Sequence, residues 1–257
     1  MVNRHPKRRG RVRRVLLLVL VALLGYGVGI AQPYVVRAPL VPGQDAMSTA
    51  ASREAVVTVE DVGGRVLSIR PTTEPRLLLI LYPGGLVRPQ AYEWLGRALA
   101  DEGVHTVIPE FPVDLAVLGA SRAEELIAEV GHGRPVVLAG HSLGGAMAAS
   151  YAADHPDDVD GLVLLAAYPS TSTSLVDAHF PALSLLAEHD EVAAEADVRD
   201  GLTRLPADTE LVVVPGAVHS FFGRYGPQSG DGQPTVSRAE AEGAIVDAIE
   251  AFLEGIA

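Results

Sequence analysis

From residue 55 onward, short and largely apolar segments alternate with longer amphipathic ones. Continuous apolar segments of this kind are typical of strands that are buried on both faces of a parallel sheet. They cover residues 77–81, 105–108, 136–139, 162–165, 183–186 and 211–214. Two earlier segments, 55–60 and 65–69, are joined through Gly63-Gly64 and predict a hairpin at the edge of the sheet.

The segments between these strands carry helix signals. Pro89 marks the start of one helix, and Ser237 and Glu240 have the spacing of a capping box at the start of the last one. The other helices are predicted over 121–130, 143–155 and 191–205, and the last helix over 237–253. Strands that alternate with helices predict an α/β fold with a mainly parallel, twisted sheet of about eight strands and helices on both faces. We expect one domain of this kind over residues 55–257.

The amino-terminal part of the chain has a different pattern. Residues 1–14 contain seven basic groups and no acidic one, and residues 15–31 are 17 uncharged, mostly apolar residues. This pattern predicts either a single transmembrane helix or the core of a signal peptide that is cleaved after Ala31. In both cases the basic residues stay in the cytoplasm and the domain lies outside it, either anchored in the cell membrane or secreted. Residues 32–54, which contain three prolines, are predicted to be a linker.

Charge and cysteine content exclude several classes of protein. Without residues 1–14 the chain has 13 basic and 32 acidic residues, so its net charge is −19. A body this acidic is a poor partner for DNA or RNA, whose binding depends on neutralising phosphates. The chain has no cysteine, which excludes disulfides, a thiol nucleophile and zinc–thiolate sites.

The residues that point to chemistry begin at residue 140. Residues 140–145 read Gly-His-Ser-Leu-Gly-Gly and connect the strand predicted over 136–139 to the helix predicted over 143–155. A G-x-S-x-G sequence between a buried strand and a helix is the setting of a nucleophile elbow, in which small residues flank a serine on a sharp turn. We therefore expect Ser142 to be a nucleophile at the carboxyl edge of the sheet. The alternative is a glycine-rich turn with a serine that has no function.

A serine hydroxyl needs a general base, and the base needs an acid that orients it. In proteins with such an elbow, the acid and then the base follow the serine along the chain. Three histidines follow the elbow helix, namely His179, His189 and His219. Only His219 follows a predicted strand through a short loop, at a carboxyl edge, so we predict that it is the base.

Asp190 is the predicted acid because it comes just after the strand predicted over 183–186, again at a carboxyl edge. Glu188 and Glu191 are the alternatives. An oxyanion hole requires two backbone N–H groups. One is expected from Leu143, the residue after the nucleophile. The other is expected from Gly85 or Leu86, in the glycine-containing loop after the strand predicted over 77–81.

In this order, Tyr82-Pro83-Gly84-Gly85, the elbow at 140–145, Asp190 and His219 resemble the α/β-hydrolase superfamily. Residues 219–228 further resemble a branch of small bacterial hydrolases that are related in fold to dienelactone hydrolase. The resemblance covers residues 55–257 and implies cleavage of esters or lactones without a cofactor. Dienelactone hydrolase has a cysteine nucleophile, which this chain lacks, so its substrate is not implied. The usual His-Gly start of the oxyanion loop is replaced here by Tyr82-Pro83.

The segment between the strands predicted over 162–165 and 183–186 is too short for a helical cap domain, so we expect an open site. Residues 226–234 are expected to form either a flap or a surface loop. Asp231 within them lacks the ligand spacing of a calcium site, and no metal site is predicted.

Together these features predict a serine hydrolase that cleaves small-molecule carboxylic esters through an acyl-enzyme intermediate. The alternatives are an acyltransferase or a perhydrolase with the same triad, or a non-catalytic, membrane-anchored binding module. A binding module would be expected to lack one residue of the triad, whereas all three residues are present.

Overall fold

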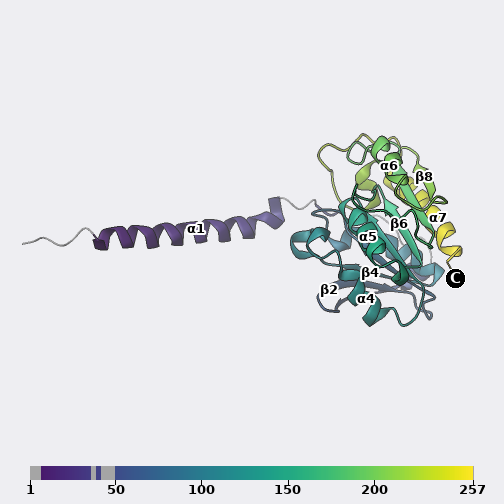
Figure 1. The fold of residues 1–257 in the computed structure, drawn as a ribbon, viewed down its shortest axis with the longest axis horizontal. Helices are drawn as coiled ribbons and strands as arrows, with labels where there is room; N and C mark the ends of the chain where they lie inside the picture. The colour runs from purple at the N-terminus through teal and green to yellow at the C-terminus, as the bar shows by residue number, and fades with distance from the viewer. Residues whose placement is uncertain (1–6, 36–38, 42–49, 257) are drawn as a thin grey trace, which may run out of the picture. The chain divides into compact units, whose positions relative to one another are not determined.

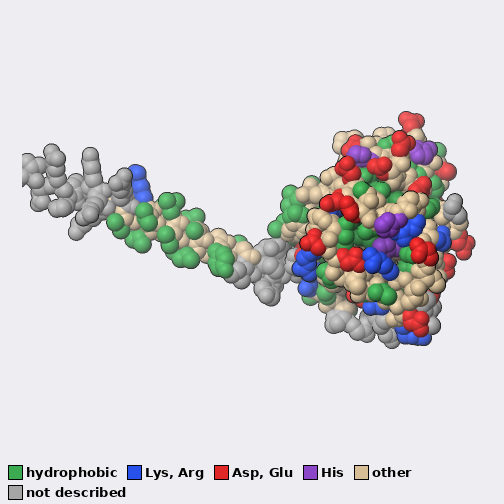
Figure 2. All heavy atoms as spheres, turned by 90° about the horizontal axis from the view of Figure 1, so that it is seen from below, with side chains coloured by type: hydrophobic (Ala, Val, Ile, Leu, Met, Phe, Trp, Pro, Cys, Tyr) green, Lys and Arg blue, Asp and Glu red, His purple; other side chains and the backbone are tan. Residues whose placement is uncertain are grey.

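The computed structural model describes residues 7–35, 39–41 and 50–256 (Figure 1). The chain forms two compact units, Met1–Arg37 and Ala38–Ala257. The first unit contains helix α1 (Lys7–Val35). Within it, Val12–Gly29 has a mean hydropathy of 1.9, and every side chain of this stretch is exposed. Figure 2 shows hydrophobic side chains along the helix. By length and composition it is able to span a membrane, and a signal sequence would have the same properties.

The predicted linker over 32–54 falls partly outside the described residues, which omit 36–38 and 42–49. Part of the described stretch has secondary structure. Residues 32–35 continue α1, and helix α2 (Ala50–Glu54) precedes the first strand. Leu40 forms an isolated antiparallel bridge with Tyr225, so part of this stretch is bound to the domain.

The second unit contains one sheet of eight strands in the order β1-β2-β4-β3-β5-β6-β7-β8. β1 and β2 form the predicted antiparallel hairpin, β2 pairs antiparallel with β4, and all other pairs are parallel. The strands are β1 (Val56–Asp61), β2 (Arg65–Arg70), β3 (Leu77–Tyr82), β4 (Val104–Pro109), β5 (Val136–His141), β6 (Gly161–Leu165), β7 (Ala182–Ala187) and β8 (Glu210–Val214). The predicted fold is confirmed.

Helices cover both faces of the sheet because the inner strands are apolar on both sides. Leu77, Leu79 and Leu81 of β3 belong to a core that includes residues of α3 and α7. The alternate residues Leu78 and Ile80 belong to a second core, on the opposite face, with residues of α4 and α5. These helices are α3 (Glu93–Leu99), α4 (Arg122–Val130), α5 (Leu143–Asp154) and α7 (Arg238–Glu254).

Two predicted helix starts can be compared with the structure. The capping box is present at α7, where the Ser237 side chain accepts from the Glu240 N–H and the Glu240 side chain accepts from the Ser237 N–H. The helix predicted over 191–205 is shorter, because α6 spans only Glu195–Leu202. The Asp190 carboxylate accepts the N–H groups of Val192 and Ala193, which keeps these residues in a turn ahead of the helix.

The connection between β6 and β7 decides how open the sheet edge is. Residues 166–181 are all described, and they contain no helix. A helical cap domain is therefore absent at this position, as the sequence predicted.

Candidate active site

The turn around Ser142 has the geometry of a nucleophile elbow. β5 ends at His141, α5 begins at Leu143, and Ser142 between them has φ 53° and ψ −123°. A non-glycine residue with positive φ in this region is strained, and such strain is concentrated at functional sites. A Cβ atom on Gly144 would lie 2.3 Å from the carbonyl oxygens of Tyr82 and Pro83, so only glycine fits where the helix meets the loop after β3.

The structure brings His219 and Asp190 together although they are 29 positions apart in the chain. His219 begins a short 3₁₀ turn, η6 (His219–Phe222), and its Nδ1 lies 2.8 Å from Oδ2 of Asp190. The side chains of His219 and Asp190 are 1% and 0% exposed. Oδ1 of Asp190 accepts the N–H groups of Val192 at 2.8 Å and Ala193 at 2.7 Å. These bonds fix the carboxylate, so that it is able to hold the imidazole in one orientation.

The side chains that were the alternatives to Asp190 and His219 either have other hydrogen-bond partners or are exposed. Oε2 of Glu188 accepts the N–H of Gly216 at 2.7 Å, and therefore supports the loop that leads to His219. Glu191 and His179 are exposed. Nε2 of His189 lies 3.3 Å from Oγ1 of Thr235. None of these four side chains has a hydrogen bond to the His219 imidazole among the described residues, whereas Asp190 has one.

The elbow and the His219 loop meet through His141, the residue before the candidate nucleophile. The rings of His141 and His219 have their centroids 4.6 Å apart. The Ser142 N–H donates to the carbonyl of Leu165 at 3.0 Å, which ties the turn to the end of β6. The candidate nucleophile, base and acid therefore lie after the carboxyl ends of β5, β8 and β7.

The candidate oxyanion hole is formed by the loop after β3 and the first turn of α5. As the first helical residue, Leu143 has an N–H group without an intrahelical acceptor. A Cβ atom on Gly85 would lie 3.3 Å from Cδ2 of Leu143, so the two residues are neighbours. The Gly85 N–H has no partner among the described residues, whereas the Leu86 N–H donates to the carbonyl of Asp114 at 2.8 Å. Of the two residues expected to supply a donor from this loop, only Gly85 has an N–H group without an acceptor among the described residues, so we retain Gly85 as the candidate.

Asp231 holds the backbone of the candidate base, a contact that the sequence did not indicate. Its carboxylate accepts the N–H groups of His219 and Ser220, each at 2.9 Å, and also that of Gly232. The loop over 226–234 thus folds back on the backbone of the candidate base. Arg238 supports the same turn, because its guanidinium donates to the Ser220 carbonyl at 2.8 Å and lies 4.4 Å from the centre of the Phe221 ring. No local motif marks these contacts, which depend on the closure of a long loop.

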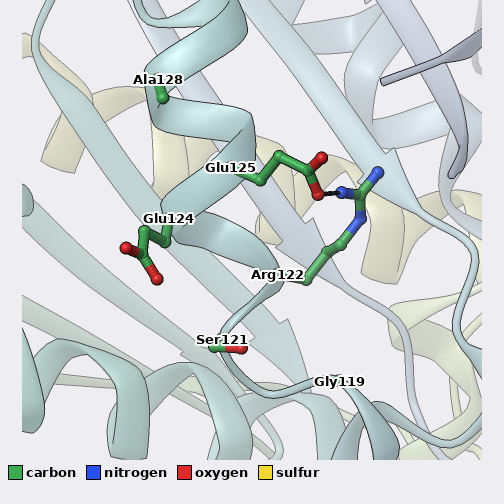
Figure 3. Close-up of a pocket in the computed structure, with 6 residues that line it drawn as sticks. All are labelled: Gly119, Ser121, Arg122, Glu124, Glu125 and Ala128. Carbon is green, nitrogen blue, oxygen red and sulfur yellow. Dashed lines mark hydrogen bonds and ion pairs between the residues drawn. The ribbon is translucent and has the colours of Figure 1, made fainter. Parts of the chain in front are cut away.

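A surface hollow at the start of α4 lies apart from these residues. Figure 3 shows that Arg122 and Glu125 point toward each other across it and form an ion pair, while Glu124 points away. None of the candidate catalytic residues lines this hollow. Among the described residues, no group of three or more histidine, aspartate or glutamate side chains is arranged to hold a metal ion.

Comparisons with known proteins agree with the fold. A profile of the family described as "Alpha/beta hydrolase family" matches residues 78–242. No curated protein matches the chain. A predicted CIB-like hydrolase from Thermoplasma acidophilum is 18% identical, with a TM-score of 0.61 over 77% of this chain and 99% of the other. A dienelactone hydrolase from Anabaena variabilis is 18% identical, with a TM-score of 0.60 over 79% and 97% of the two chains. Est1E from Butyrivibrio proteoclasticus is 14% identical, with a TM-score of 0.55 over 78% and 98%.

Proposed function

The chain belongs to the α/β-hydrolase family, and on that premise we propose that it is a serine hydrolase that cleaves carboxylic esters. The observation that carries the proposal is the buried 2.8 Å bond between Nδ1 of His219 and Oδ2 of Asp190, in a chain whose Ser142 has elbow geometry. Because an ionised carboxylate only accepts, Nδ1 of His219 is the donor in this bond. Nε2 is then free to take a proton from Ser142.

The reaction follows from these positions in two halves. Oγ of Ser142 attacks the ester carbonyl while His219 takes its proton, and the negative oxygen that forms accepts the N–H groups of Leu143 and Gly85. His219 then gives the proton to the alcohol as the C–O bond breaks, which leaves an acyl-enzyme on Ser142. Water attacks this ester by the same route in the second half, and the carboxylic acid leaves.

The open sheet edge supports a small ester as the substrate. Ser142 and Leu143 are partly exposed, and residues 166–181 add no helix above them. Two of the similar structures are a dienelactone hydrolase and a predicted CIB-like hydrolase. The dienelactone substrate is not transferred to this chain, because this chain has no cysteine and its candidate nucleophile is a serine.

We further propose that the enzyme acts outside the cytoplasm and is held at the cell membrane by α1. The apolar window Val12–Gly29 and the seven basic residues before residue 15 support this orientation, because positive residues stay on the cytoplasmic side. Secretion after cleavage near Ala31 is the second possibility that the same pattern supports.

The experiment that tests the activity is hydrolysis of p-nitrophenyl esters of increasing acyl length by the wild type and by Ser142→Ala. We expect the variant to lose kcat by a factor on the order of 10⁴–10⁶ while its Tm changes little, because only one oxygen is removed. Activity of the variant within tenfold of the wild type would assign the nucleophile to another residue.

A further inference from the structure

The hydroxyl of Tyr92 lies between the candidate oxyanion loop and the elbow. Tyr92 ends the 3₁₀ turn η1 (Pro89–Tyr92) and is 0% exposed. Its oxygen accepts the Gly84 N–H at 2.9 Å and lies 2.8 Å from Nδ1 of His141. Gly84 directly precedes Gly85, and His141 directly precedes Ser142. One hydroxyl therefore connects the neighbours of an oxyanion donor and of the nucleophile.

The direction of these hydrogen bonds follows from the donor at Gly84. A backbone N–H only donates, so the Tyr92 oxygen is its acceptor; because His141 is the only other hydrogen-bond partner of Tyr92 among the described residues, we assign the Tyr92 O–H as the donor to Nδ1 of His141. His141 then carries its proton on Nε2. Burial raises the pKa of Tyr92 and lowers the pKa of His141 well below its usual range, while the His219 carbonyl has a smaller opposing effect on His141. Both side chains are therefore neutral near pH 7.

The surroundings leave this arrangement little freedom. A Cβ atom on Gly84 would lie 2.8 Å from Nδ1 of His141 and 3.1 Å from the Tyr92 oxygen, so the loop is packed directly against both side chains. The His141 ring also lies against the His219 ring, with 4.6 Å between their centroids. The carbonyl of Ala91 accepts the Arg224 N–H at 2.7 Å, which ties the same turn to the chain just after His219.

We propose that Tyr92 is a positioning residue, which through Gly84 and His141 fixes the Gly85 N–H relative to Ser142. This inference rests on the proposed function, because it assigns Tyr92 a part in the oxyanion hole of that reaction. Tyr92 does not touch the reacting atoms. Its effect is exerted through the backbone of the oxyanion loop, so its loss should weaken binding of the transition state more than binding of the substrate.

The test is Tyr92→Phe, which removes one oxygen and keeps the ring. We expect kcat to fall about 10- to 100-fold with KM changed less than about twofold, because a displaced oxyanion donor costs less than the 10²–10³ of a deleted one. The affinity for an alkyl trifluoromethyl ketone, which forms an oxyanion adduct on the serine, should fall by the same factor as kcat/KM. Tyr151→Phe is the matched control, because it removes a hydroxyl that bonds Asp158 near the far end of α5. It should keep kcat within about twofold.

Variants of His141 provide a second route if Tyr92→Phe does not fold. His141→Asn places an amide oxygen near the position of Nδ1 and should keep kcat within about fivefold of the wild type. His141→Leu removes the acceptor and should lose as much as Tyr92→Phe. In the double variant with Tyr92→Phe the two losses should not add, because both remove the same hydrogen bond.

The results separate the two proposals. If the wild type hydrolyses esters but Tyr92→Phe and His141→Leu keep kcat and ketone affinity within twofold, the positioning role is wrong. The role is also wrong if KM rises as much as kcat falls, or if Asn and Leu at position 141 are equally damaging. If the wild type neither hydrolyses esters nor binds the ketone, the proposed function itself is wrong.

Discussion

Ser142 holds a backbone conformation that most residues avoid. Positive φ at a non-glycine residue costs on the order of 1–3 kcal/mol, and the surrounding structure must compensate for it. Here the Ser142 N–H is bonded to the carbonyl of Leu165, and Gly144 allows the helix to approach the loop after β3. Ser142 is partly exposed on this sharp turn, and its conformation is the reason for proposing it as the nucleophile.

The variant Asp190→Asn separates the proposed acid from its acidic neighbours. The substitution keeps the shape of the side chain but favours the wrong imidazole tautomer, so kcat should fall roughly 10⁴-fold. Glu188→Gln is the matched control, because Glu188 bonds the Gly216 N–H rather than the imidazole. Steady-state kinetics of both variants on one ester checks the assignment. A large loss in Glu188→Gln with little loss in Asp190→Asn would make Glu188 the acid.

Some of these residues were predictable from the chain and others were not. The elbow turn at Ser142 was predictable because strand, turn and helix are all local signals around one motif. The preference for Asp190 over Glu188 rested on the position of a strand end. Tyr92 and Asp231 were not identified, because their bonds to Gly84 and to the His219 backbone join segments that meet only in the folded sheet.

The positions of the strands and helices also depend partly on local sequence and partly on contacts made only in the folded protein. The inner strands were predictable from continuous apolar sequence, and α7 from its capping box. The start of α6 was placed four residues too early, because the Asp190 carboxylate holds the N–H groups of Val192 and Ala193 and the helix begins only after them. A side chain that precedes the helix therefore overrides the helix pattern at this point.

The pairing of β2 with β4 buries the imidazole of His105. Because of this burial, we predict that the stability of the fold depends on pH. Nε2 of His105 lies 2.9 Å from Oγ of Ser68, and burial, with a further effect of Arg70, lowers the pKa of His105 to about 4. Below an ordinary pKa of 6.5 the unfolded chain binds a proton that the folded chain does not bind. Stability is therefore lost as the pH falls from about 6.5 to about 4.

Urea unfolding at pH 7 and pH 5 measures this effect. His105 should lower the free energy of unfolding by about 1–2 kcal/mol between these pH values. In His105→Gln the loss over the same interval should be smaller by that amount, whatever the variant's stability at pH 7. An equal loss in wild type and variant would mean that His105 does not carry the dependence.

The distribution of charge along the whole chain predicts its topology in the membrane. The seven basic residues before residue 15 favour a cytoplasmic amino terminus, and the remaining net charge of −19 belongs to the part that would cross the membrane. Figure 2 shows acidic side chains scattered over the visible face of the domain. The fold itself, by contrast, depends on the apolar strands and not on this charge.

Protease treatment of intact spheroplasts tests the topology. External protease should degrade the hydrolase domain and leave only the basic amino-terminal tail protected. A salt wash of isolated membranes then distinguishes the anchored form from the secreted form. An anchored protein stays in the membrane, whereas a product cleaved near Ala31 is soluble. If the domain is protected until the cells are lysed, it lies in the cytoplasm, and both the anchored and the secreted alternative are wrong.

The proposal that Ser142 is an activated nucleophile is tested by labelling with a fluorophosphonate probe, followed by mass spectrometry of the labelled peptide. Only an activated serine reacts readily with such a probe, so the test does not depend on the identity of the ester. We expect one label on Ser142 in the wild type, none in Ser142→Ala, and a strongly slowed reaction in His219→Ala. Failure of the folded wild type to react, or a label on a different residue, would contradict the assignment of this protein as a serine hydrolase acting through Ser142.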